Sequence, residues 1–94
     1  MPEELGPPPR REEGSAWPHI LVYGASWCQD TARTRRFLNR RAIPYILIDV
    51  EEDPDAARRV REWNNGYLST PTLDVAGRIV AEPSDEELVK LLGL

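Results

Sequence analysis

The fold of this chain is decided by residues 23–31, which read Tyr23-Gly24-Ala25-Ser26-Trp27-Cys28-Gln29-Asp30-Thr31. Residues 20–23 form a continuous apolar run of strand length, and residues 28–41 contain neither Gly nor Pro and favour a helix. The only cysteine therefore stands where a strand is predicted to end and a helix to begin. A thiol at a helix N-terminus lies beside unsatisfied backbone N–H groups and the positive end of the helix dipole, and both favour its thiolate form.

The rest of the chain repeats this alternation of strand and helix. Asp53 before Pro54 is typical of a helix start, and Ser84 with Glu87 fits a capping box at another. The elements predicted in chain order are strand 20–23, helix 28–41, strand 45–50, helix 54 to 63 or 64, hairpin strands 72–75 and 78–81, and a helix from 84 onward. The order β-α-β-α-β-β-α predicts an α/β fold in which a four-stranded mixed sheet is flanked by three helices.

Burial can also be predicted from these patterns. Residues 45–50 are almost entirely apolar, so we expect this strand to be buried on both faces. Leu38 should point inward from its helix. Val60, Trp63 and Tyr67 fall at spacings that share one helix face, and Gly66 favours the end of that helix.

Composition narrows the class of protein. The chain has 94 residues and a net charge of −4, so it is expected to be one domain that binds no nucleic acid. No apolar run is long enough to span a membrane. One cysteine and one histidine cannot make a metal site in one chain, and a lone cysteine excludes an internal disulfide framework. We therefore expect a cytoplasmic monomer without a bound cofactor.

The N-terminal segment differs from the remainder. Residues 1–16 hold several prolines and paired Glu and Arg residues, with no apolar periodicity. We expect a disordered tail over 1–16 and a folded domain over 17–94.

The motifs in this order resemble the thioredoxin superfamily, specifically small glutaredoxins and most closely mycoredoxin-like proteins. The resemblance covers about residues 19–92 and implies a thioredoxin-like fold. It rests on four segments, which are Trp27-Cys28, Ile48-Asp49-Val50-Glu51, Thr70-Pro71 and Glu82-Pro83-Ser84-Asp85.

The resemblance also implies roles for individual residues. Cys28 would be the attacking thiolate, with Trp27 shielding its sulfur. Thr70 would offer backbone hydrogen bonds to the cysteinyl part of a small thiol, and Pro71 would be cis and form the opposite wall. Ser84 and Asp85 would meet the polar end of that thiol, although both are also explained as helix caps.

Residues 28–31 depart from the Cys-x-x-Cys motif of dithiol relatives, because Thr31 stands in place of the second cysteine. A dithiol cycle is therefore excluded, and a monothiol cycle is predicted. Cys28 would reduce mixed disulfides between proteins and a low-molecular-weight thiol, while the Thr31 hydroxyl would donate a hydrogen bond to the thiolate.

A second departure concerns charge. Ala25 stands where glutathione-using relatives often carry a lysine, and Asp30 stands where they commonly carry a tyrosine. The thiol co-substrate is therefore left open between glutathione, mycothiol and bacillithiol. Two other functions remain as alternatives: a monothiol glutaredoxin that binds an iron–sulfur cluster between two subunits, and a catalytically silent thioredoxin-fold adaptor.

Overall fold

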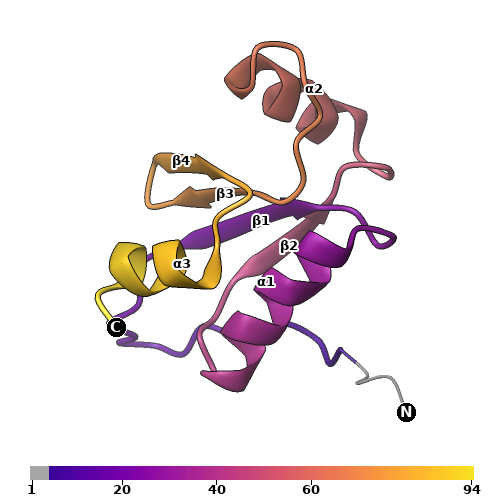
Figure 1. The fold of residues 1–94 in the computed structure, drawn as a ribbon. Helices are drawn as coiled ribbons and strands as arrows, with labels where there is room; N and C mark the ends of the chain where they lie inside the picture. The colour runs from indigo at the N-terminus through magenta and orange to yellow at the C-terminus, as the bar shows by residue number, and fades with distance from the viewer. Residues whose placement is uncertain (1–4) are drawn as a thin grey trace.

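The computed structural model describes residues 5–94, and within them the predicted order of elements is confirmed (Figure 1). The elements are β1 (Ile20–Gly24), α1 (Gln29–Arg40), β2 (Ile46–Asp49), α2 (Pro54–Trp63), β3 (Thr72–Val75), β4 (Arg78–Ala81) and α3 (Asp85–Leu92). The predicted α/β class, with a mixed sheet and helices on it, is therefore correct.

The sheet has the strand order β2-β1-β3-β4. β1 pairs in parallel with β2, and Leu21 lies opposite Ile46. β1 pairs antiparallel with β3, and β3 with β4, where Leu73 lies opposite Val80. β1 is thus an inner strand. Cys28 follows shortly after its carboxyl end, which is at Gly24.

Two apolar clusters fix the helices on opposite faces of this sheet, because successive strand residues point to opposite sides. On one face, Phe37 and Leu38 of α1 and Leu88 of α3 pack against Val22 and Leu73. The other face packs against α2, through residues that include Tyr23, Ala56 and Val60. α1 and α3 therefore form one layer and α2 the other, as Figure 1 shows.

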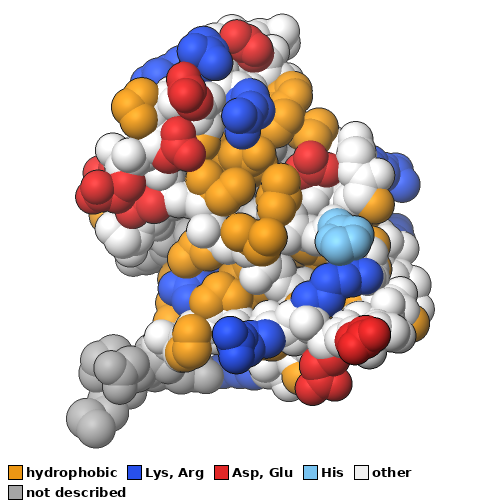
Figure 2. Space-filling model, turned by 180° about the vertical axis from the view of Figure 1, so that it is seen from behind, with side chains coloured by type: hydrophobic (Ala, Val, Ile, Leu, Met, Phe, Trp, Pro, Cys, Tyr) orange, Lys and Arg blue, Asp and Glu red, His pale blue; other side chains and the backbone are white. Residues whose placement is uncertain are grey.

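The expectation that residues 45–50 form a strand buried on both faces is wrong. The strand runs only from Ile46 to Asp49, and the side chain of Ile46 is 61% exposed. β2 lies at the edge of the sheet, and the apolar cluster that includes α2 is packed against by Ile48 but not by Ile46. Figure 2 shows a band of hydrophobic side chains on the rear surface of the molecule.

Tyr67 also differs from its prediction. Val60 is fully buried and Trp63 packs against the same cluster, but Tyr67 is 73% exposed. α2 ends at Trp63, and Gly66 has a φ of +95°, so the helical spacing does not extend as far as Tyr67.

The first four residues of the predicted tail lie outside the described residues. Residues 5–16 contain neither helix nor strand. The Gly6 carbonyl accepts hydrogen bonds from Arg35 Nη2 (2.8 Å) and Asn39 Nδ2 (3.2 Å), both on α1. No helix among residues 5–94 is long and apolar enough to cross a membrane.

Candidate active site

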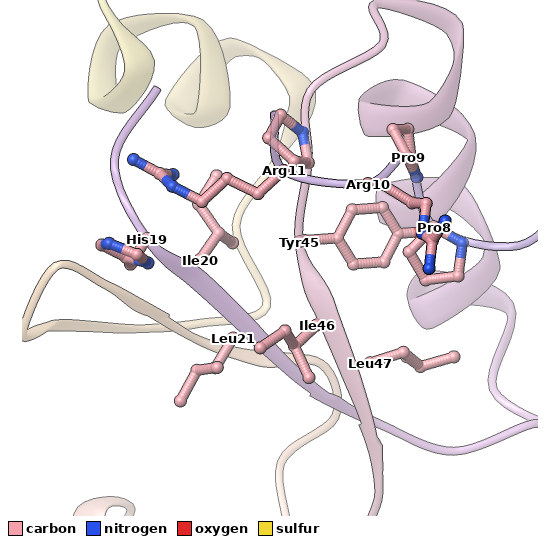
Figure 3. Close-up of a pocket in the computed structure, with 11 residues that line it drawn as sticks. Pro8, Pro9, Arg10, Arg11, His19, Ile20, Leu21, Tyr45, Ile46 and Leu47 are labelled. Atoms are coloured by element: carbon pink, nitrogen blue, oxygen red, sulfur yellow. The ribbon is translucent and has the colours of Figure 1, made fainter. Parts of the chain in front are cut away.

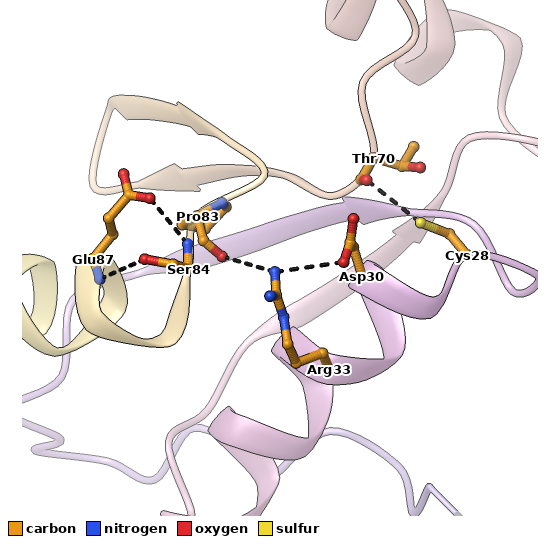
Figure 4. A network of polar contacts seen from close by, with 7 residues as sticks. All are labelled: Cys28, Asp30, Arg33, Thr70, Pro83, Ser84 and Glu87. Atoms are coloured by element: carbon orange, nitrogen blue, oxygen red, sulfur yellow. Dashed lines mark hydrogen bonds and ion pairs between the residues drawn. The ribbon is translucent and has the colours of Figure 1, made fainter.

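Cys28 is the N-cap of α1. Its backbone N–H donates to the Ala25 carbonyl, and its own carbonyl accepts from the Ala32 N–H, each at 3.1 Å. The backbone at Cys28 is extended, with φ −83° and ψ 120°, and its side chain makes no capping hydrogen bond. Instead the thiol donates to the Thr70 carbonyl oxygen at 3.4 Å, across 42 residues of sequence (Figure 4). The sulfur therefore lies between the start of α1 and the segment before β3.

The surroundings of this sulfur favour its ionised form. Burial raises the pKa of the Cys28 thiol, but hydrogen bonds outweigh it and lower the pKa overall. The donors are the hydroxyl of Thr70, the backbone N–H and hydroxyl of Thr31, and the backbone N–H of Asp30. Asp30 and Thr31 are the second and third residues of α1, so their N–H groups are among those that the helix leaves without an acceptor. A thiolate at Cys28 takes the place of the missing cap.

Thr31 is held close to the end of β1. Its side chain is buried, and its Oγ1 accepts a hydrogen bond from the Ala25 N–H at 3.3 Å. A Cβ on Gly24 would overlap the Thr31 side chain far inside van der Waals contact. Glycine at position 24 is therefore what lets the Thr31 hydroxyl come near the sulfur.

Thr70 and Pro71 form the wall opposite α1. Both are buried, and the peptide bond between them is cis, as the family resemblance implied. Thr72 anchors the same segment, because its hydroxyl donates to the Ser69 carbonyl at 2.8 Å. The predicted neighbours Cys28, Thr31 and Thr70 are thus brought together. Their assignment to catalysis and binding remains a prediction.

Ser84 and Asp85 lie at the start of α3. The Ser84 hydroxyl accepts from the Glu87 N–H, and the Glu87 carboxylate accepts from the Ser84 N–H, each at 3.1 Å. The predicted capping box is therefore present. Asp85 is the first residue of the helix and is exposed. The capping box accounts for both the hydroxyl and the backbone N–H of Ser84. A role of Ser84 and Asp85 in ligand binding remains a prediction.

Arg33 connects these two parts of the site. Among the arginines of the first helix, the sequence marks Arg33 as the one that could supply a positive charge near Cys28, but it does not predict the contacts that Arg33 makes. Its Nη2 lies 3.6 Å from Asp30 Oδ1 and donates to the Pro83 carbonyl at 3.3 Å (Figure 4). α1 is therefore joined to the residue that precedes Ser84. The arginines of this helix predict a solvated face, and no local pattern could reveal a contact with a residue 50 positions away.

Large side chains are exposed on the two segments that carry the site. Trp27, next to Cys28, is 68% exposed, and Leu68, two residues before Thr70, is 37% exposed. Tyr67 beside Leu68 is exposed as well. The sulfur is thus flanked along the chain by apolar surface that a protein partner can cover.

A cavity of about 670 Å³ lies away from Cys28, between the tail and the edge strand β2 (Figure 3). It begins at His19 and Ile20, at the opposite end of β1 from the cysteine, and its other lining residues include Pro8, Pro9 and Ile46. Neither a thiol nor a carboxylate lines it. Within residues 5–94, no three His, Cys, Asp or Glu side chains group as a metal site would require.

Comparison with known proteins agrees with this geometry. The thioredoxin-like protein BC3987 has a similar solved structure, with a TM-score of 0.69 and 33% sequence identity over 78% of this chain and 99% of that one. Glutaredoxins from Archaeoglobus fulgidus (TM-score 0.64, 23% identity, 86% and 95% covered) and Methanosarcina mazei Go1 (0.66, 24%, 82% and 80%) share the fold.

None of the curated protein sequences matches the chain. The comparisons do not single out mycoredoxins, so that nearer resemblance stays a prediction. The sequence model of the glutaredoxin family, however, matches residues 20–80, which is well over half of the chain and includes Cys28, Thr31, Thr70 and Pro71. This chain belongs to the glutaredoxin family.

Proposed function

We propose that this protein is a monothiol oxidoreductase that reduces mixed disulfides between proteins and a low-molecular-weight thiol. Its family and fold support a function of the thiol–disulfide oxidoreductase type. The observation that carries the proposal is the position of Cys28, whose thiol pKa is lowered although the fold provides no second cysteine.

The chemistry follows from thiolate exchange. The Cys28 thiolate attacks the small-thiol sulfur of a protein–S–S–R disulfide. A Cys28–S–S–R bond forms, the original disulfide breaks, and the protein leaves as its thiolate, which takes a proton from water. A second R–S⁻ then attacks the R sulfur, releasing R–S–S–R and restoring the Cys28 thiolate. The two electrons come from the small thiol, so no metal or bound cofactor is needed.

Each residue has a task in this proposal. Thr31 and Thr70 stabilise the thiolate by hydrogen bonds, and Trp27 covers one side of the sulfur. The Thr70-Pro71 segment receives the R group near its sulfur, while Ser84 and Asp85 meet its polar end at the start of α3. An anionic group of R at that helix start would also be stabilised by the helix dipole.

Other features of the proposal come from the sequence. Glutathione, mycothiol and bacillithiol are the candidates for R–SH. We place the protein in the cytoplasm as a monomer, because a lone catalytic thiol works in a compartment that keeps small thiols reduced. Its protein partners would be those that carry a mixed disulfide with R.

The experiment that tests the proposal measures Cys28 directly. Because Cys28 is the only thiol, alkylation by neutral iodoacetamide reports on it alone. We expect the midpoint of the pH profile to lie below about 8.5 in the native protein and to return there on denaturation. Turnover of a glutathionylated peptide should be lost in Cys28→Ser. An unshifted midpoint, or turnover retained in that variant, would contradict the proposal.

Two matched variants distinguish the effect of the Thr31 hydroxyl on Cys28 from the effect of any substitution on the same helix. Thr31→Val keeps the shape of the side chain but removes the hydroxyl. We expect a higher alkylation midpoint and slower turnover in Thr31→Val. Arg36→Gln, on the same helix and without a contact to Cys28, should leave both unchanged.

A further inference from the structure

The start of α1 presents opposite charges in a fixed order as one moves away from the sulfur. Cys28 caps the helix, Asp30 follows at its second position, and Arg33 lies one turn further along. Arg33 in turn contacts Pro83, beside the start of α3. Along this line a molecule attached to Cys28 would meet a carboxylate first and a guanidinium second, as Figure 4 shows.

The guanidinium of Arg33 is only partly used. One nitrogen, Nη2, makes both the 3.3 Å bond to Pro83 and the 3.6 Å contact with Asp30. Nε is buried without a hydrogen-bond partner. Because Nε is buried, a carboxylate can approach only the exposed part of the Arg33 side chain, which is 42% of its surface.

Asp30 is likewise only loosely engaged. Its Oδ1 makes the long contact with Arg33, and about half of its side chain is exposed, compared with 42% for Arg33. An ion pair this exposed is worth little, so incoming charged groups can compete for both members. The pair has no net charge, yet it offers an acceptor and a donor at separate points.

We propose that Asp30 and Arg33 make this site selective for small thiols that carry both an ammonium and a carboxylate group. The proposal rests on the mixed-disulfide reductase function and specifies its R group. In the Cys28–S–S–R intermediate, the ammonium of R pairs with Asp30 and the carboxylate of R pairs with Arg33. A thiol with only a carboxylate gains from Arg33 but is opposed by Asp30, and a thiol with only an ammonium gains from Asp30 but is opposed by Arg33.

The test uses one synthetic peptide with a single cysteine, disulfide-linked to each of four thiols. These are cysteine (both charges), N-acetylcysteine (carboxylate only), cysteamine (ammonium only) and 2-mercaptoethanol (neither). Each enzymatic rate is divided by the rate at which free dithiothreitol cleaves the same disulfide, which removes differences in intrinsic reactivity. We expect cysteine to be preferred over either single-charge thiol by about threefold, the scale of a half-exposed ion pair.

Two variants assign the preference to its residues. Asp30→Asn should abolish the preference for cysteine over N-acetylcysteine, and Arg33→Gln the preference for cysteine over cysteamine. Asp30→Asn also removes a negative charge near the thiolate, which affects all four substrates alike, so the ratio is the readout. Arg36→Gln should change neither ratio, and 1 M salt should reduce both toward one.

The outcomes separate the two proposals. Cleavage of all four disulfides at equal relative rates, unchanged by Asp30→Asn and Arg33→Gln, overturns this inference and leaves the reductase function standing. No cleavage of any disulfide above the Cys28→Ser background overturns the reductase function itself. A preference for cysteine that persists in both variants would assign selectivity to other residues and reject the inference.

Discussion

The starts of α1 and α3 differ in how they treat the backbone N–H groups that a helix leaves without an acceptor. At α3, Ser84 and Glu87 satisfy each other's backbone N–H groups through a complete capping box. At α1, the N-cap is Cys28, whose side chain makes no capping hydrogen bond. One helix start is closed by its own side chains, while the other keeps its N–H groups for a charged sulfur. The comparison teaches that the start of α1 lacks the local cap of α3 and holds instead a thiol whose pKa is lowered.

The ionisable groups at the two helix starts show the same contrast. Hydrogen bonds from the backbone and the hydroxyl of Ser84 lower the pKa of Glu87, an acid that is already ionised at neutral pH. At α1, hydrogen bonds lower the pKa of Cys28 against the effect of burial. Only the second shift moves a titration toward neutrality, because an ordinary thiol titrates at about 8.5 and an ordinary carboxyl far below 7.

The largest expected effect is a loss of stability caused by a substitution at the start of α1. Gly24→Ala places a methyl group against Thr31, so the helix start must shift. We expect the free energy of unfolding to fall by about 1–3 kcal/mol, the range for an overpacked interior. Urea denaturation measures this. Gly6→Ala is the matched control, since a methyl group there meets nothing within 4 Å. Equal losses in the two variants would contradict the close approach of Gly24 and Thr31.

A smaller loss of stability is expected when the capping box at the start of α3 is broken. Ser84→Ala removes the acceptor of the Glu87 N–H, and we expect a loss of about 1 kcal/mol in urea denaturation. The pKa of Glu87, followed by NMR, should rise only in part, because the backbone N–H of residue 84 is the larger cause of its lowering and remains in the variant. Glu86→Gln, an exposed neighbour in the same helical turn, should change stability by less than about 0.5 kcal/mol. A Glu87 pKa that does not change at all would show that the Ser84 hydroxyl does not contribute to its lowering.

The converse change sharpens the comparison, because it gives α1 the kind of cap that α3 has. Cys28→Ser should raise the free energy of unfolding by about 0.5 kcal/mol, since serine is a good N-cap. The measurement belongs at an acidic pH below the native pKa of Cys28, where the wild-type sulfur is a neutral thiol. Cys28→Ala should give no such gain. Greater stability of Cys28→Ala than of Cys28→Ser would contradict the view that α1 lacks a cap.

The smallest expected effect is a pH dependence of stability. The native pKa of Cys28 is lowered, so the unfolded chain binds more protons at this group between the native pKa and about 8.5. Its contribution is therefore complete above 8.5 and is lost as the pH falls through the native pKa. Wild-type stability should rise with pH across this window relative to Cys28→Ser. A flat difference between the two proteins would rule out a lowered thiol pKa.

Much of the fold and part of the site could be predicted because their signals are local. The apolar run before Gly24 predicts a strand, and the segment without Gly or Pro after Cys28 predicts a helix. Together they determine the strand-to-helix junction. The capping box at Ser84 is likewise contained in four residues. These predictions are confirmed in the structure.

The predictions that failed depend on distant parts of the chain. An apolar strand looks the same at the edge of a sheet as at its centre, so the exposure of Ile46 follows only from the strand order. The contact between Arg33 and Pro83 joins two segments that have no shared periodicity. Tyr67 was misassigned because helical spacing was extended past Gly66, where the backbone has already left the helix.

The position of the tail beside β2 has a consequence for self-association. An edge strand as apolar as Ile46-Leu47-Ile48 offers unpaired backbone groups to any other chain and is a template for aggregation. Pro8 and Pro9 line the same cavity as Ile46 and Leu47, and the bonds to Gly6 hold this segment against α1. Proline has no N–H to donate, so it cannot extend the sheet. A tail in this position obstructs the pairing of a second strand with β2, so we expect its removal to lower solubility at high concentration while leaving the chemistry of Cys28 unchanged.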